Sequence, residues 1–146
     1  MIRQATKYDI EAILGLLKNY RDAEIFGLAA KTTREDVMPV ISEILAGRGV
    51  IFISEKETPR GLIIGYVSPN FWTPQTIEMH EVAFWVDPEY RGGTDAYRLI
   101  NAYVEYGNKL KEEKRIDFFN VSKMSYSPDL KYDRFGFSKM HEVWIK

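Results

Sequence analysis

A glycine turn between an apolar run and a helical pattern is the stretch of this chain best suited to chemistry. The residues from 81 to 99 read EVAFWVDPEYRGGTDAYRL, with two adjacent glycines at its centre. A strand that passes through such a turn into a helix leaves several backbone N–H groups without partners. These groups and the helix dipole favour negative charge. The spacing predicts an anion site from Arg91 to Ala96, with a plain tight turn as the alternative.

Composition limits the classes of function. The chain has 146 residues, a net charge of −1 and 45% hydrophobic residues, which is typical of one globular domain spanning residues 1–146. This balance argues against a nucleic-acid partner or an anionic membrane. No signal-peptide pattern or membrane-spanning run is present, so a cytoplasmic protein is expected. Two histidines and no cysteine offer no zinc site, no disulfide and no thiol nucleophile.

The elements that must position the turn follow from hydrophobic periodicity. Helices are expected from residue 10 to about 20, from 33 to 47 with Pro39 as a kink or as the true start, from 94 to about 114, and from 127 to 136. Strands are expected at 2–4, 50–53, 62–67, 77–86 and 116–121, with one or two more within 137–145. The order predicts an α/β fold with a mixed sheet of about seven strands and helices on both faces.

Two motifs within this order resemble those of the GNAT (Gcn5-related) N-acetyltransferase superfamily. Residues 86–93, VDPEYRGG, are similar to the acetyl-CoA signature V-x-P-x-[YF]-[RQ]-G-x-G. Residues 132–137, YDRFGF, match the C-terminal Y-x-x-x-G-F. The resemblance covers the whole chain and implies a GNAT-like acyl-CoA N-acyltransferase fold. The RGG form after Phe84-Trp85-Val86 also resembles a subgroup often met in bacteriophages.

The resemblance implies a binding site for acetyl-CoA. The turn of Arg91, Gly92 and Gly93 would hold the pyrophosphate, because glycines let backbone N–H groups approach phosphate oxygens. Thr94 stands where the family prefers glycine, and it either caps the helix or binds a phosphate oxygen. Asp95 suits the helix dipole but would compete with the pyrophosphate for N–H groups. Ala96 has an acceptable size.

Strand backbone and one short side chain complete the cofactor site that the resemblance implies. Backbone groups of Phe84, Trp85 and Val86 would polarise the thioester carbonyl and pair with the pantetheine arm. Ser125 stands where many relatives have an asparagine that contacts the cofactor, although serine is shorter.

The resemblance also implies an acid and a base. His80 occupies the position of the family's base, and an imidazole titrates near neutral pH; a histidine that only satisfies a local hydrogen bond is the alternative. In a regular strand Glu78, His80, Val82, Phe84 and Val86 share one face, so Glu78 is the reserve base. Glu81 would reach that face only through a β-bulge. Tyr132 matches the family's general acid, with core packing as its alternative.

The sequence therefore predicts acetyl transfer to a primary amine by direct attack, with acetyl-CoA as the only co-substrate and no metal. A GNAT-fold module that binds CoA or a protein partner without turnover is the alternative. The acceptor is a small-molecule or peptide amine, and a homodimer is left open. Segments 21–31 and 68–74, which have the weakest patterns, are expected on the acceptor side.

Overall fold

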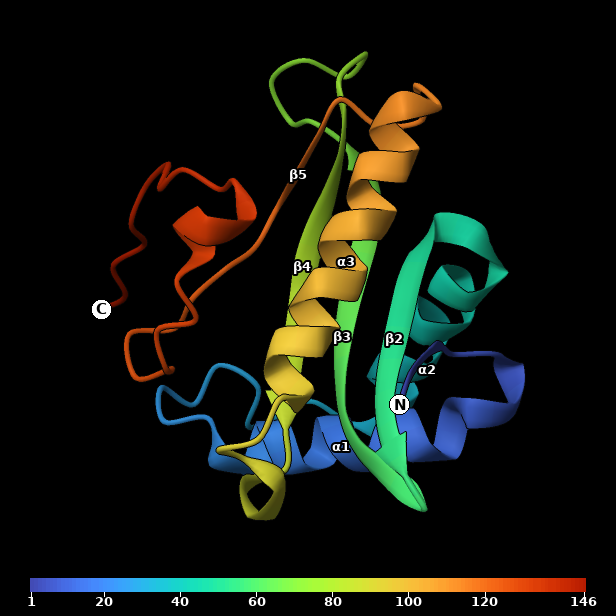
Figure 1. The fold of residues 1–146 in the computed structure, drawn as a ribbon, viewed down its shortest axis with the longest axis vertical. Coiled ribbons are helices and arrows are strands. Elements are labelled where there is room, and N and C mark those ends of the chain that lie inside the picture. Colours follow the sequence, from blue (N-terminus) through green and yellow to red (C-terminus); the bar gives the residue numbers. More distant parts are fainter.

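The computed structural model describes residues 1–146 and shows a mixed five-stranded sheet with helices on both faces (Figure 1). The strands lie in sequence order. The first four, which are antiparallel, are β1 (Ile2–Gln4), β2 (Gly49–Lys56), β3 (Thr58–Pro69) and β4 (Ile77–Val86). The last, β5 (Phe118–Asn120), runs parallel to β4.

Three of the four predicted helices are present, and they cover the sheet. The helices α1 (Ile10–Ala23) and α2 (Arg34–Glu43) cover one face, and α3 (Asp95–Glu112) covers the other (Figure 1). Capping boxes at Thr6 and Thr33 begin the segments that lead into α1 and α2, because each hydroxyl and a following aspartate satisfy free N–H groups. The second helix continues through Pro39. No helix combines the length and the apolar composition needed to cross a membrane.

A β-bulge in β4 changes which of its side chains share a face. Ile64 pairs with Ala83 and Gly65 pairs with Glu81, so Val82 has no partner of its own in β3. Before the bulge Met79 packs with α3, whereas after it Ala83 packs with the opposite cluster. The prediction that residues 78, 80, 82, 84 and 86 share one face is therefore wrong.

The strands β4 and β5 pair only over a short distance. Their parallel register runs from the pair Glu78–Phe118 to the pair His80–Asn120 and ends there. The second edge of β4 is consequently free of strand pairing from Glu81 to Val86. This open edge leads directly to the glycine turn.

The C-terminal quarter differs from the sequence prediction. Residues 127–136 do not form a full helix but a single helical turn, η4 (Tyr132–Phe135). The Asp129 carboxylate accepts a hydrogen bond from the Lys131 N–H at 2.9 Å, and Lys131 adopts a left-handed φ of 58°, which interrupts helical geometry before the turn. Residues 137–145 form no strand. The prediction of about seven strands is therefore wrong, because the sheet has five. Strand-forming side chains do not suffice when the segment lies exposed without a paired neighbour.

Candidate active site

The turn between β4 and α3 presents unpaired backbone N–H groups. The chain passes through one turn, η3 (Pro88–Tyr90), and Gly92 takes a φ of +91°, which favours glycine because a Cβ would be strained there. Thr94 occupies the cap position of α3, but no side chain caps the helix. The N–H groups of the first helical turn therefore have no side-chain acceptor, which is the arrangement that an anion completes.

The side chain of Arg91 points back to the strand end. Its guanidinium carbon lies 4.5 Å from the centre of the Trp85 ring, and its Nε donates to the Val86 carbonyl at 2.8 Å. Trp85 in turn donates from Nε1 to Asp87 at 2.8 Å. In this arrangement the Arg91 side chain stabilises the turn, and the backbone N–H groups of the turn, not the guanidinium, face an anion.

The three backbone positions predicted for the thioester differ in orientation. The Asp87 N–H donates to the Arg60 carbonyl of β3 at 2.8 Å. Backbone groups alternate between the two edges of a strand, so those of Trp85 also face β3, whereas those of Phe84 and Val86 face the open edge. Because the Val86 carbonyl already accepts a hydrogen bond from Arg91, only Phe84 has both its N–H and its carbonyl open at this edge.

The first residues of α3 turn their side chains away from solvent. The Asp95 side chain is only 19% exposed, and its carboxylate lies 3.9 Å from the Arg60 guanidinium. Ala96 is half-buried and packs against the cluster beneath α3. Asp95 is thus directed toward a cation instead of toward the free N–H groups.

Glu81, which regular alternation predicts on the face opposite His80, has the most strongly shifted pKa of any carboxylate in the chain. Burial raises its pKa to about 8, and the nearby Ser122 backbone acts in the opposite direction. Its charge contributes to the raised pKa values of Tyr20, Tyr103 and Tyr132, after the larger effect of burial, so these phenols lie around it. The bulge at Val82 puts Phe84 and Val86 on the same face as Glu81, and no one-dimensional pattern marks that bulge.

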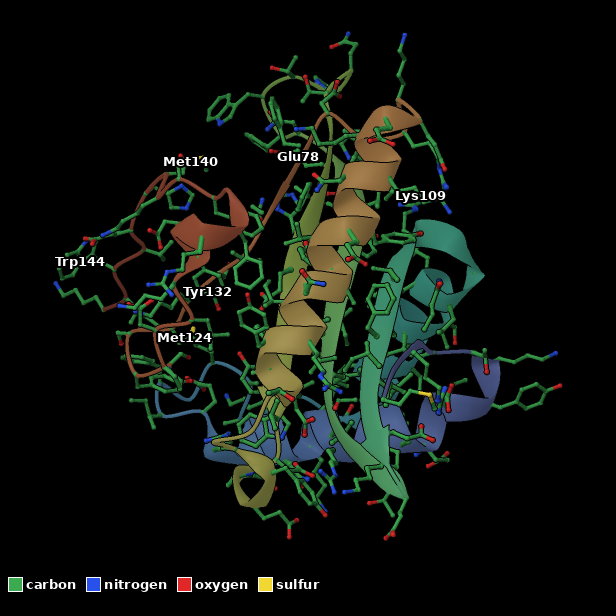
Figure 2. All side chains as sticks on the ribbon, in the orientation of Figure 1. Glu78, Lys109, Met124, Tyr132, Met140 and Trp144 are labelled. Atoms are coloured by element: carbon green, nitrogen blue, oxygen red, sulfur yellow. The ribbon has the colours of Figure 1, made fainter.

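Tyr132 belongs to this group. It lies on the side of the sheet that α3 covers, where its ring contacts Phe137 edge-on at 6.3 Å between centroids (Figure 2). Burial and then the charges of Glu81 and Asp129 raise its pKa to about 12. The hydroxyl therefore stays protonated near neutral pH and can donate a proton.

His80 is held in a different network. Its Nδ1 lies 2.9 Å from the Asn120 side-chain amide, which donates to it, and its Nε2 lies 3.5 Å from the Glu78 carboxylate. His80 follows Met79, which points to α3, so its ring lies on the other side of β4 from Tyr132. The structure does not bring His80 and Tyr132 together, and Figure 2 shows Glu78 near the start of β4, apart from Tyr132.

Ser125 and one of the two weakly patterned segments lie near the tyrosines. Ser125 is exposed in a turn that the Ser127 N–H closes onto the Met124 carbonyl at 3.0 Å. Its neighbour Tyr126 contacts Phe26 of the loop after α1, with 6.0 Å between the ring centroids. The other segment, 68–74, lies at the opposite end of β4 (Figure 1). Only the loop after α1 therefore borders the Glu81 side of the molecule.

A cavity of about 340 Å³ lies between the end of α1 and the β4–α3 turn. Its lining carries three carboxylates and one aromatic ring, that of Trp85. The lining residues are Asn19, Asp22, Ala23, Trp85, Asp87, Pro88 and Glu89. One of these carboxylates, that of Asp87, accepts hydrogen bonds from Asn19 and Trp85. The negative charge of this lining suits a cation more than an anion.

Solved structures share this fold at low sequence identity. An acetyltransferase from Clostridium acetobutylicum, solved with acetyl-CoA, superposes with a TM-score of 0.71 at 17% identity, covering 100% of this chain and 94% of that one. AAC(6')-Iy in complex with a CoA bisubstrate analogue gives 0.68 at 18%, covering 100% and 95%. A transcriptional regulator from Bacillus halodurans gives 0.70 at 17%, covering 100% and 97%. At these identities the likeness concerns the fold alone.

Sequence comparison identifies the family. A search of curated proteins finds no significant match. The model of the acetyltransferase (GNAT) family, in contrast, matches residues 16–137, which include the bulged strand, the uncapped helix and Tyr132. The chain therefore belongs to the GNAT acetyltransferase family.

Proposed function

We propose that the protein transfers an acetyl group from acetyl-CoA to a primary amine by direct attack. One observation carries the proposal. Glu81, a carboxylate whose pKa burial raises to about 8, lies beside the open edge of β4, and its charge acts on the buried, protonated Tyr132. That edge ends at the free N–H groups of α3. Acetyl transfer from acetyl-CoA requires three parts: a site for the pyrophosphate, a strand edge that orients the thioester, and an acid and a base for the proton transfers.

The residues present fit coenzyme A, which supplies the acetyl group as a thioester. The uncapped N-terminus of α3 and the left-handed Gly92 would hold the pyrophosphate, with Arg91, Gly93, Thr94, Asp95 and Ala96 completing the turn. The open backbone groups of Phe84 and the Val86 N–H would orient the pantetheine arm, and Trp85 would support them from the opposite face. Ser125 contributes a hydroxyl at most.

Glu81, and not His80, is the base in this proposal. An ammonium acceptor must lose a proton before it attacks, and a carboxylate with a pKa of about 8 can take that proton directly or through water. The two ring nitrogens of His80 already face Asn120 and Glu78. Tyr132 would donate its proton to the departing sulfur, because its raised pKa keeps it protonated.

The acceptor is proposed only as a cationic amine. The loop after α1 and the segment around Tyr126 border Glu81. Burial raises the pKa values of Tyr20 and Tyr126, and the negative charge of Glu24 adds to both shifts. Negative charge and aromatic rings favour an ammonium group. The placement in an RGG-type subgroup and the homodimer stay predictions.

The test is a ligand titration followed by a rate measurement. Acetyl-CoA should raise the melting temperature with concentration, since it binds only the folded state. Amines from several classes should then release free thiol in proportion to protein concentration. A melting temperature that stays constant at millimolar acetyl-CoA would refute the proposal. A shift without thiol release from any amine would support the alternative of a binding module.

A further inference from the structure

We propose that Arg60, at the end of β3, is a positioning residue for the turn that binds the coenzyme A pyrophosphate. The proposal rests on the function proposed above. Arg60 precedes Gly61, which pairs with Val86 at the last position of β4. A Cβ at Gly61 would meet the Trp85 carbonyl oxygen at 2.6 Å, so glycine alone lets β3 approach the strand end this closely. Arg60 is thereby brought beside the turn.

Arg60 contacts three successive parts of the connection from β4 to α3. Its carbonyl accepts the Asp87 N–H at 2.8 Å, where β4 ends. Its guanidinium carbon lies 4.3 Å from the centre of the Tyr90 ring, in the middle of the connection. One guanidinium nitrogen lies 3.9 Å from the Asp95 carboxylate, where α3 begins. A single residue therefore holds the start, the middle and the end of the turn.

The contact with Asp95 has an electrostatic consequence for an anion. Asp95 is the first residue of α3, so its carboxylate would otherwise repel a pyrophosphate or occupy the same N–H groups. Arg60 draws this carboxylate toward β3 and balances its charge. Both side chains are mostly buried, with 26% and 19% of their surface exposed, so water screens the pair only in part.

Hydrogen bonding alone does not explain the position of this guanidinium. Its Nε is buried and has no acceptor, which is unfavourable for folding. The position of the guanidinium is explained if its contacts with Tyr90 and Asp95 hold the turn in the conformation that binds the anion. A side chain that only stabilised the fold would gain more from a saturated set of hydrogen bonds.

Two variants and one substrate analogue test the proposal. In Arg60→Met the KM for acetyl-CoA should rise about tenfold while kcat changes less than about threefold, because an unbalanced Asp95 repels the pyrophosphate. The KM for S-acetylpantetheine, which has no pyrophosphate, should stay within about twofold. Adding Asp95→Asn to Arg60→Met should restore most of the acetyl-CoA KM, since the repelling charge is then gone.

The matched control is Arg48→Met. Arg48 likewise lies over a tyrosine, 6.0 Å from the centre of the Tyr66 ring, and pairs with Glu43 at 3.4 Å, but it lies immediately before β2, away from the turn. The Arg48→Met variant should leave the KM values for acetyl-CoA and for S-acetylpantetheine unchanged. Equal losses with both substrates, or no rescue by Asp95→Asn, would overturn the role of Arg60 and leave the proposed function intact. Wild-type protein that does not bind acetyl-CoA would instead remove the proposed function.

Discussion

At the scale of single residues, Glu81 has an environment that a carboxylate rarely tolerates without a reason. It is surrounded by phenols and has no cation among the groups that shift its pKa. Burial without a compensating positive charge is what raises a carboxylate pKa toward neutrality. Such shifts are frequent where a protein needs a base that works near pH 7 to 8. The two ring nitrogens of His80, in contrast, face Asn120 and Glu78, and 39% of its side-chain surface is exposed.

Replacing each candidate base separates their roles. Glu81→Gln should lower kcat about 100-fold, which is the usual contribution of general base catalysis. It should also abolish the rise of the rate with pH, which in the wild type should level off near pH 8, the pKa of Glu81. His80→Gln should change kcat less than about threefold. Steady-state rates from pH 6 to 9.5 provide the measurement, and an equal loss in His80→Gln would return the role to the histidine.

The same substitution has an effect on stability with a definite sign. The pKa of Glu81 rises from 4.5 to about 8 on folding, so between these values the folded state binds more protons than the unfolded state. Stability then decreases as pH rises from about 4.5 to 8. Glu81→Gln should therefore be more stable than wild type by about 2 kcal/mol at pH 8.5, after a discount for water access, and about equal at pH 4.5.

Thermal unfolding at both pH values checks this expectation. The control is Gln75→Ala, because this exposed, uncharged side chain lies in the loop between β3 and β4 and should give a small difference that does not vary with pH. A difference between Glu81→Gln and wild type that stays constant with pH would contradict a raised pKa at Glu81.

At the scale of elements, the bulge in β4 and the free start of α3 act together. The bulge brings Phe84 and Val86 to the face of Glu81 and Tyr132, and the loss of pairing with β5 leaves this backbone open. The uncapped α3 lies at the end of this open edge. A well-capped helix would be more stable but would leave fewer N–H groups for an anion.

A substitution at the cap position should change stability and binding in opposite directions. Thr94→Asp places a negative charge at the N-terminus of α3, so it should stabilise the apoprotein by roughly 0.5 kcal/mol through the helix dipole. The same charge should weaken acetyl-CoA binding about tenfold or more, because it competes with and repels the pyrophosphate. Melting temperatures with and without acetyl-CoA measure both effects.

The control for this variant is Thr73→Asp, in the exposed loop between β3 and β4. It adds the same charge far from α3 and should change neither quantity. If Thr94→Asp bound acetyl-CoA as tightly as wild type, the start of α3 would not be the anion site.

At the scale of the whole molecule, the sheet ends at β5 and the C-terminal residues stay outside it. Met140, Val143 and Trp144 are each at least 80% exposed, and Figure 2 shows Met140 and Trp144 at the outer edge of the molecule. Phe137, immediately before them, is half-buried and contacts Phe119 and Tyr132. The boundary of the packed structure therefore falls at about Phe137.

Truncation tests this boundary. Deleting residues 138–146 should lower the melting temperature by less than about 2 °C, since exposed side chains contribute little burial. Phe137→Ala should lower it by about 5 °C, because a half-buried aromatic ring is lost from the cluster beneath α3. A large loss on deletion would show that the segment is part of the sheet, as the seven-strand prediction required.

Local patterns in the sequence determined most of the framework. The spacing of apolar residues located β4 at its observed limits and α3 to within about two residues, because each element carries a complete stripe of core side chains. The glycine turn and the Tyr132 motif indicated the family, which the match to residues 16–137 confirms. These features depend on neighbours in the chain, so one dimension is enough to see them.

Only the tertiary structure decided which polar side chains meet. The bulge at Val82 depends on how β4 pairs with β3, and a shift of one residue moves every following side chain to the other face. It therefore put Phe84 and Val86 on the face of Glu81 and Tyr132 instead of on the face of His80. In the same way local spacing predicts that Asp95 competes with an anion, whereas in the structure its carboxylate lies 3.9 Å from Arg60, 35 residues earlier in the chain. Long-range pairing of this kind has no signature in local spacing.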